Sequence, residues 1–115
     1  MNDLIRQVEQ WAEDRGFFEE CGPTALQQYK VLQEEVTELH TELVALDIDN
    51  RYDCDEADTL RKAKLELGDV FVVGIIIARL LDVDATECLQ SAYNKIKDRK
   101  GEWRNGKWTK NSDKQ

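Results

Sequence analysis

The sequence predicts an all-α protein, a four- to five-helix bundle that a second copy of the chain completes. Helix-favouring residues fill long uninterrupted stretches, and the 115 residues include a single proline. Apolar residues recur at intervals of three and four, whereas the alternating pattern of strands is almost absent. A chain of this length forms one domain whose core benefits from a partner subunit.

The first helix is expected over residues 2–15. Leu4, Val8 and Trp11 share a narrow apolar face, and Gly16 is a typical C-terminal stop. A connector through Pro23 follows, and Thr24 is a suitable N-cap for the next helix. Because its apolar face is narrow, the helix over residues 2–15 contributes little buried surface of its own.

The second helix is expected over residues 24–46. It has the clearest apolar stripe in the chain, with Ala25, Tyr29, Leu32, Val36, Leu39, Leu43 and Leu46 at alternating steps of four and three. Glu35 lies on one flank of this stripe, and Glu38 lies further round on the same side. The acidic stretch 47–58 is expected to form a connecting loop.

The third helix, expected over residues 56–81, has two stripes. One consists of Leu60, Ala63, Leu67, Val70, Gly74, Ile77 and Leu81, and the other of Glu66, Asp69, Val73, Ile76 and Leu80. Residues 70–78 are apolar on every side, a pattern typical of a helix that is buried all round. Since so short a chain cannot surround this helix alone, we expect a dimer with the helix near its interface.

The fourth helix is expected over residues 85–100, with a basic C-terminal end. Trp103 and Trp108 flank an Asn105-Gly106 dipeptide, which predicts a hairpin. We therefore divide the chain into a helical domain, residues 1–100, and a C-terminal tail, residues 101–115, that contains the hairpin.

Composition excludes several classes of function. A net charge of −8 argues against binding of a nucleic acid polymer, because phosphates require basic residues. No apolar run approaches the roughly 18 residues of a membrane span, and no signal peptide is recognisable, so we expect a cytosolic protein without membrane contact. The three widely spaced cysteines match neither a zinc motif nor a disulfide framework.

Two carboxylate pairs stand out on the predicted helices, Glu35 with Glu38 and Glu66 with Asp69. Side chains three residues apart on a helix are neighbours on one face. If the pairs face each other, each close pair of like charges costs about 4 kcal/mol at an effective dielectric constant of ~20. Such a cluster requires a cation, and oxygen ligands favour Mg²⁺, with Mn²⁺ as the alternative.

Each feature also has a simpler interpretation. Acidic pairs on helices are commonly solvated surface, although Glu66 and Asp69 continue a core stripe, which surface acids rarely do. A di-iron centre would need Glu-x-x-His pairs, and Thr37 stands three residues before His40, the only histidine. Basic residues at the end of the fourth helix also match the helix dipole.

Together these motifs resemble those of the MazG-like all-α nucleoside triphosphate pyrophosphohydrolases. The resemblance covers residues 11–110 and rests on Glu34-Glu35-x-x-Glu38, Glu66-x-x-Asp69, the upstream Gln27-x-x-Lys30 and the basic segment 94–101. It implies hydrolysis of a nucleoside triphosphate to the monophosphate and pyrophosphate. The metal would be held by Glu35, Glu38, Glu66 and Asp69.

The resemblance also implies roles for other residues. Glu34, Glu35 and Glu38 would form the catalytic set, in which Glu34 either supports the metal ligands from behind or orients the attacking water. The simpler interpretation of Glu34 is a solvated helix acid. Substrate binding would involve Trp11, Gln27 and Lys30 near the base or sugar, and Asn94, Lys95, Lys97 and Arg99 near the phosphates. Trp11 is equally suited to core packing, and Trp103 and Trp108 are expected to anchor the tail rather than to stack a base.

The expected assembly is a homodimer or a homotetramer built from two dimers. The alternative function, from a different class, is a non-catalytic acidic helical module that binds a protein partner. That alternative predicts acidic residues spread over an outer surface, which the partly apolar stripe at Glu66 and Asp69 disfavours.

Overall fold

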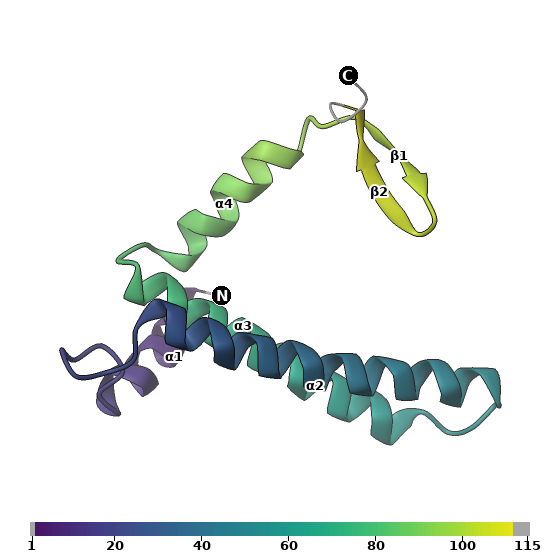
Figure 1. Ribbon diagram of the computed structural model, residues 1–115, viewed down its shortest axis with the longest axis horizontal. Coiled ribbons are helices and arrows are strands. Elements are labelled where there is room, and N and C mark those ends of the chain that lie inside the picture. The colour runs from purple at the N-terminus through teal and green to yellow at the C-terminus, as the bar shows by residue number, and fades with distance from the viewer. Residues whose placement is uncertain (1, 112–115) are drawn as a thin grey trace. The chain divides into compact units, whose positions relative to one another are not determined.

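The computed structural model describes residues 2–111 and confirms the all-α class. Its elements are α1 (Asn2–Asp14), α2 (Ala25–Arg51), α3 (Ala57–Leu80), α4 (Ala85–Ile96), β1 (Gly101–Arg104) and β2 (Lys107–Lys110) (Figure 1). The chain divides into an N-terminal unit, residues 1–85, and a C-terminal unit, residues 86–115. Within the described part of the chain, every helix is too short or too polar to cross a bilayer.

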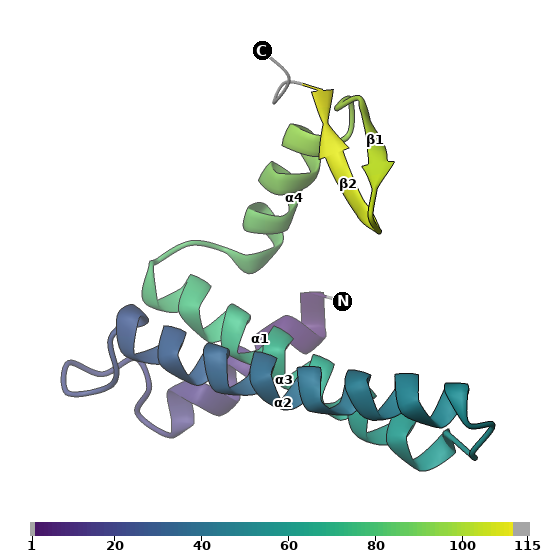
Figure 2. The same ribbon diagram turned by 45° about the vertical axis from the view of Figure 1, so that its right-hand side comes forward.

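The N-terminal unit is a long helical hairpin with one short helix packed on it. α2 and α3 run antiparallel and side by side along their lengths in both views (Figures 1 and 2), and α1 packs against α3. The most deeply buried apolar side chains are small or β-branched, and they come from α1 and α3: Ala12, Ala63, Val73, Ile76 and Ala78. Small side chains allow the helices to approach closely.

Reciprocal capping fixes the start of α2. The Thr24 hydroxyl accepts a hydrogen bond from the Gln27 backbone N–H at 3.1 Å, and the Gln27 side-chain oxygen accepts one from the Thr24 N–H at 2.9 Å. This capping box satisfies two backbone donors that a helix start leaves unpaired. Thr24 is therefore the N-cap that the sequence predicts.

α2 is longer than predicted, and the expectation of a loop over residues 47–58 is wrong in its first half. The helix continues through Asp47, which pairs with Arg51 one turn later at 3.2 Å. Asp49 accepts a hydrogen bond from the Thr59 hydroxyl of α3 at 2.8 Å. These contacts turn an acidic stretch into helix, because its charges are partly matched within and across the hairpin.

The stripe that α2 shields from solvent retains alternate members of the predicted one, Ala25, Leu32, Leu39 and Leu46, but the residues before Tyr29, Val36 and Leu43 take the places of those three. The shielded positions include Gln28, Leu32, Glu35, Leu39, Glu42, Leu46 and Asp49 on α2, and Thr59, Ala63, Glu66, Val70, Val73, Ile77 and Leu80 on α3. Val36 and Leu43, expected in the core, are 48% and 50% exposed. Polar residues at every seventh position of α2 thus lie in the hairpin interior.

Five apolar residues that each directly follow a shielded position form an exposed apolar stripe. It comprises Val36 and Leu43 on α2, and Leu60, Leu67 and Phe71 on α3. Successive residues step by about 100° around a helix, so on two antiparallel helices these side chains project to the same side of the hairpin. The expected burial of residues 70–78 on every side is therefore not reached in a single chain, where Phe71 is 62% exposed.

The C-terminal unit consists of α4 and a two-stranded hairpin. α4 ends at Ile96, so the expectation that it continues to Lys100 is wrong. The charged run after Ile96 has no apolar side chain to bury, and the extended strand that pairs with β2 begins at Gly101. The predicted hairpin is present, with φ of 51° at Asn105 and 77° at Gly106, as a type I′ turn requires.

Candidate functional site

Three carboxylates from two helices converge where α2 and α3 face each other, two of them half-buried and one exposed. One oxygen from each of Glu35, Glu38 and Glu66 lies within 4.8 Å of the other two. Glu35 and Glu38 are one turn apart on α2, and the antiparallel α3 brings Glu66 beside them. We call these three residues the carboxylate cluster. Asp69, one turn after Glu66, is close enough to act electrostatically on both Glu35 and Glu66.

The members of the carboxylate cluster differ in exposure. Glu35 and Glu66 are half-buried, whereas Glu38 and Asp69 are exposed at the rim. The Oε2 atoms of Glu35 and Glu66 are shielded from solvent and, within residues 2–111, have no hydrogen-bond partner. Buried polar atoms are normally satisfied in folded proteins, so these two oxygens indicate a missing partner.

Burial and mutual repulsion both oppose ionisation in the cluster. Loss of hydration raises the pKa of Glu35, and the charges of Glu38 and Asp69 raise it further. The pKa of Glu66 is likewise raised, first by desolvation, then by its interaction with Glu38 and by the charge of Asp69. Each cause disfavours a carboxylate that no positive charge neutralises.

A divalent cation fits this arrangement. The donors are all carboxylate oxygens, which suit Mg²⁺ or Mn²⁺ better than metals that prefer sulfur or imidazole. A cation would also satisfy the unpartnered Oε2 atoms and reverse the repulsion that raises the two pKa values. Within residues 2–111, the ion pairs that Lys and Arg side chains form involve neither Glu35 nor Glu66.

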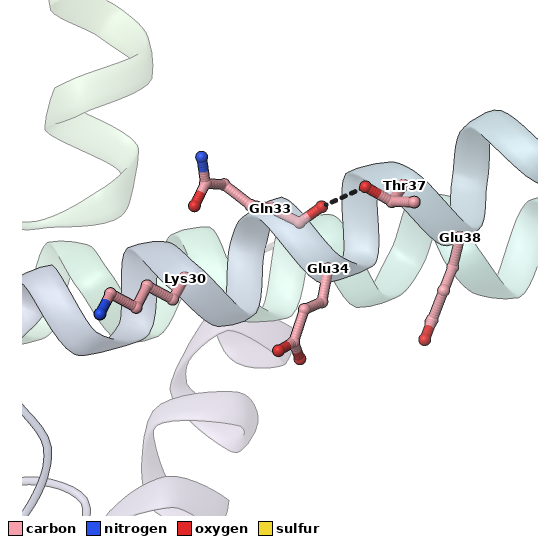
Figure 3. Close-up of a pocket in the computed structure, with 5 residues that line it drawn as sticks. All are labelled: Lys30, Gln33, Glu34, Thr37 and Glu38. Carbon is pink, nitrogen blue, oxygen red and sulfur yellow. Dashed lines mark hydrogen bonds between the residues drawn. The ribbon is translucent and has the colours of Figure 1, made fainter.

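A shallow open hollow runs along α2 next to the cluster. Lys30, Gln33, Glu34, Thr37 and Glu38 line it (Figure 3). Glu34 and Glu38 extend from the same side of the helix, and the Lys30 ammonium lies towards one end. The Thr37 hydroxyl donates to the Gln33 carbonyl at 2.9 Å. Glu38 belongs to both the hollow and the carboxylate cluster. An anionic ligand in the hollow would therefore lie near the cluster and within reach of the Lys30 ammonium group.

Two of the predicted substrate-binding residues have structural contacts of their own. Trp11 packs against Phe17, with ring centroids 5.7 Å apart, and the Arg15 guanidinium lies 4.4 Å from the Trp11 ring. Gln27 uses its side-chain oxygen in the α2 capping box. Within residues 2–111, these contacts of Trp11 and Gln27 do not involve the carboxylate cluster.

Lys30 lines the hollow on α2, and the remaining four predicted substrate-binding residues belong to the C-terminal unit. Asn94 accepts a hydrogen bond from the Gln90 side chain at 3.0 Å, and Lys95 is in the last turn of α4. Lys97 and Arg99 lie in the segment between α4 and β1. Asn94, Lys95, Lys97 and Arg99 belong to a different unit from the carboxylate cluster, so their contact with phosphate stays a prediction.

Sequence reasoning missed two polar residues of the hairpin interior. Gln28 is only 8% exposed, and Glu42 is half-buried, on the stripe that contains Glu35. The signal was available, because Gln28, Glu35, Glu42 and Asp49 follow one another at intervals of seven. An apolar stripe nearby concealed this polar repeat.

Comparison with known proteins gave one match. The sequence model of the MazG nucleotide pyrophosphohydrolase domain matches residues 24–103. No curated protein and no solved structure matches the chain. The matched region includes α2, α3 and α4, and with them the carboxylate cluster, Asp69 and the basic residues that follow α4.

Proposed function

Because the chain belongs to the MazG nucleotide pyrophosphohydrolase family, we propose that it hydrolyses a nucleoside triphosphate to the monophosphate and pyrophosphate in a Mg²⁺-dependent reaction. One observation carries the proposal beyond family membership. The oxygens of Glu35, Glu38 and Glu66 lie within 4.8 Å of one another, and two of these side chains have a shielded oxygen without a partner. A cluster of this kind is suited to a cation that also binds polyphosphate.

Four carboxylates would hold the metal, namely Glu35, Glu38, Glu66 and Asp69. Mg²⁺ is the preferred ion because it commonly combines a few carboxylates with phosphate oxygens of the substrate, and Mn²⁺ is the alternative. When bound, such an ion supplies positive charge to the polyphosphate and lowers the pKa of a coordinated water. The protein would then have to position the substrate and the water.

The hollow along α2 supports roles for two further residues. Lys30 would contact phosphate oxygens through its ammonium group, which forms charge-assisted hydrogen bonds. Glu34 lies beside Glu38 on the same side of α2, where it would accept a hydrogen bond from the attacking water and orient it. The basic residues Lys95, Lys97 and Arg99, together with Asn94, would complement the remaining phosphate charge. The proposal does not depend on Trp11 or Gln27.

The exposed apolar stripe supports assembly with a second copy. It extends over both long helices and includes Phe71 at 62% exposure. Gly74 lies on the same side of α3, and among residues 2–111, apart from the adjoining turns of α3 itself, no atom comes within 4 Å of a Cβ built on it. A contiguous apolar surface with a glycine in mid-helix is typical of a helix interface with close approach. We therefore include a homodimer, or a pair of dimers, in the proposal.

The activity is tested with a panel of nucleoside and deoxynucleoside triphosphates in Mg²⁺, with pyrophosphate and orthophosphate measured separately. Pyrophosphate release from at least one substrate is expected, together with strong loss in Glu38→Gln and Asp69→Asn. Glu13→Gln is a matched control, because it removes one exposed negative charge from α1, outside the cluster. Absence of pyrophosphate with every substrate, or release that both cluster variants retain, would overturn the proposal.

A further inference from the structure

The hairpin of the C-terminal unit presents two tryptophans on one face. Trp103 of β1 is directly opposite Trp108 of β2 in the strand register, so both side chains project from the same side of the sheet. Their ring centroids are 5.6 Å apart, with an angle of 67° between the ring planes. Trp103 is 71% exposed and Trp108 is 45% exposed.

The two indoles are not equivalent. A Cβ built on Gly101 would lie 2.9 Å from Cε2 of Trp108, so the Trp108 ring covers the backbone at Gly101. Trp103 projects further into solvent. An edge-to-face pair uses the face of only one of its rings, so aromatic surface of this pair remains open for stacking.

The segment that contains these rings is rich in basic residues, although the whole chain has a net charge of −8. In the strand register Lys110 shares the face of the two tryptophans, whereas Glu102, Arg104 and Lys107 project from the other face. Between residues 95 and 110 the acidic residues are Asp98 and Glu102, and the basic residues are Lys95, Lys97, Arg99, Lys100, Arg104, Lys107 and Lys110. Arg104 pairs with Glu102 at 2.6 Å. The exposed aromatic pair therefore lies within a segment of net positive charge.

Aromatic surface combined with positive charge recognises a nucleotide. An indole stacks on the π-face of any base, and ammonium or guanidinium groups attract its phosphates. We propose that the Trp103–Trp108 face of the hairpin binds a free nucleotide by stacking on its base. This surface belongs to the C-terminal unit alone, and the inference depends on the proposed function only for the identity of the nucleotide.

A free nucleotide is favoured over a nucleic acid polymer for two reasons. The face contains a single aromatic pair, whereas surfaces that bind single strands offer successive platforms for successive bases. In addition, all but four of the 24 acidic residues precede residue 86, and they would repel a long polyanion. A mononucleotide needs only one stacking site and a few cations.

Binding is measured without divalent metal, in EDTA, so that hydrolysis and metal-dependent binding at the carboxylate cluster do not contribute. A Trp11→Phe/Trp108→Phe variant retains Trp103 as its only tryptophan. We expect saturable quenching of Trp103 fluorescence by a nucleoside triphosphate and none by tripolyphosphate, which has the charge but no base. No quenching, or equal quenching by tripolyphosphate, would overturn the inference, as would tighter binding of a single-stranded oligonucleotide.

Substitutions at Trp103 separate stacking from support of the hairpin. With a triphosphate whose base is fluorescent, Trp103→Leu should weaken binding about tenfold, whereas Trp103→Phe should retain most of the affinity. Because a ring at residue 103 also supports the edge-to-face pair, the emission of Trp108 is compared in both variants, and it should be the same if the hairpin is intact. Tyr93→Leu, which removes another exposed aromatic ring of this unit, is the control and should bind normally. Equal affinity of the Leu and Phe variants would contradict the proposal.

The same data distinguish failure of this inference from failure of the proposed function. Trp103 quenching without pyrophosphate release from any substrate would leave the nucleotide-binding face and remove the enzyme. Pyrophosphate release without quenching would leave the enzyme and remove the nucleotide-binding face. A blue-shifted Trp103 emission that no nucleotide changes would show that protein, such as a second copy, covers the face, and it would overturn the inference.

Discussion

The N-terminal and C-terminal units place their functional groups in opposite ways. In the N-terminal unit, two long helices hold Glu35 and Glu66 partly buried and close to like charges. In the C-terminal unit, the tryptophans and most of the cations are exposed on four-residue strands and the segment before them. Half of the 16 basic residues follow residue 85, but only four of the 24 acidic ones do.

This difference has an energetic meaning. The long helical hairpin can force unfavourable carboxylates together because its apolar contacts outweigh their repulsion. An isolated two-stranded hairpin is only marginally stable, so the C-terminal unit has little stability with which to hold unfavourable groups. The carboxylate cluster is therefore held together by the fold of its own unit, whereas the C-terminal unit exposes its aromatic and basic side chains on a scaffold of little stability.

A substitution at Glu66 should separate activity from stability. Glu66→Gln removes a proposed metal ligand, and since even groups behind metal ligands typically contribute 10- to 100-fold, activity should fall by at least about 100-fold. The metal-free protein should nevertheless melt at a higher temperature at neutral pH, because one repelling charge is gone. Initial rates and thermal melts in EDTA test both parts. A less stable Glu66→Gln protein would contradict the electrostatic account of the cluster.

Metal binding should stabilise the N-terminal unit. With Mg²⁺ at 100 times its dissociation constant, unfolding should become about 2.7 kcal/mol less favourable, which a thermal melt detects as a higher Tm. Asp69→Asn should reduce this shift strongly, and Glu13→Gln should leave it unchanged. An acidic module that only binds a protein partner would show no such dependence on Asp69.

One glycine tests the exposed apolar stripe. In an isolated helix, Gly74→Ala should stabilise the protein by about 1 kcal/mol. If a second copy packs closely there, the added methyl group should instead shift the mass measured by light scattering from a multiple of 13.3 kDa towards one chain. Gly68→Ala is the matched control on α3, since its Cβ also meets open space but lies away from the stripe. A wild-type monomer would exclude the interface.

A substitution in the turn should affect the C-terminal unit alone. Gly106 has a φ of 77°, which alanine adopts at a cost of about 1 kcal/mol. Gly106→Ala should therefore loosen the hairpin and change the tryptophan fluorescence, while the helical melting transition stays the same. A matching loss of helical stability would show that the two units are energetically coupled.

The stability of the metal-free protein should also depend on pH in a defined direction. The folded protein raises the pKa of Glu35 and Glu66 above the ordinary value of 4.5, so it binds more protons than the unfolded chain between the ordinary and the raised values. Stability should therefore fall as pH rises through that interval. Saturating Mg²⁺ should reverse the trend, since protons compete with the metal. Denaturant unfolding at several pH values, in EDTA and in saturating Mg²⁺, measures the free energy of unfolding in each case.

Local signals in the sequence were sufficient for several elements. Thr24 predicted the start of α2, Gly16 predicted the end of α1, and Asn105-Gly106 predicted the hairpin. Each signal depends on a few adjacent residues and their allowed backbone angles. The end of α2 was different, because its helical state at Asp49 depends on Thr59, ten residues away.

The sequence by itself determined the helical class, the family and the two carboxylate pairs, because helix period and residue spacing place side chains on a face. Only the tertiary structure decided which face of α2 meets α3. That choice buries Glu35 and Glu66 and leaves Val36 and Phe71 exposed. The physical reason is that α2 and α3 each have more than one face able to pack, and periodicity alone does not rank them. Contacts across the hairpin, such as the hydrogen bond between Thr59 and Asp49, select the face that packs.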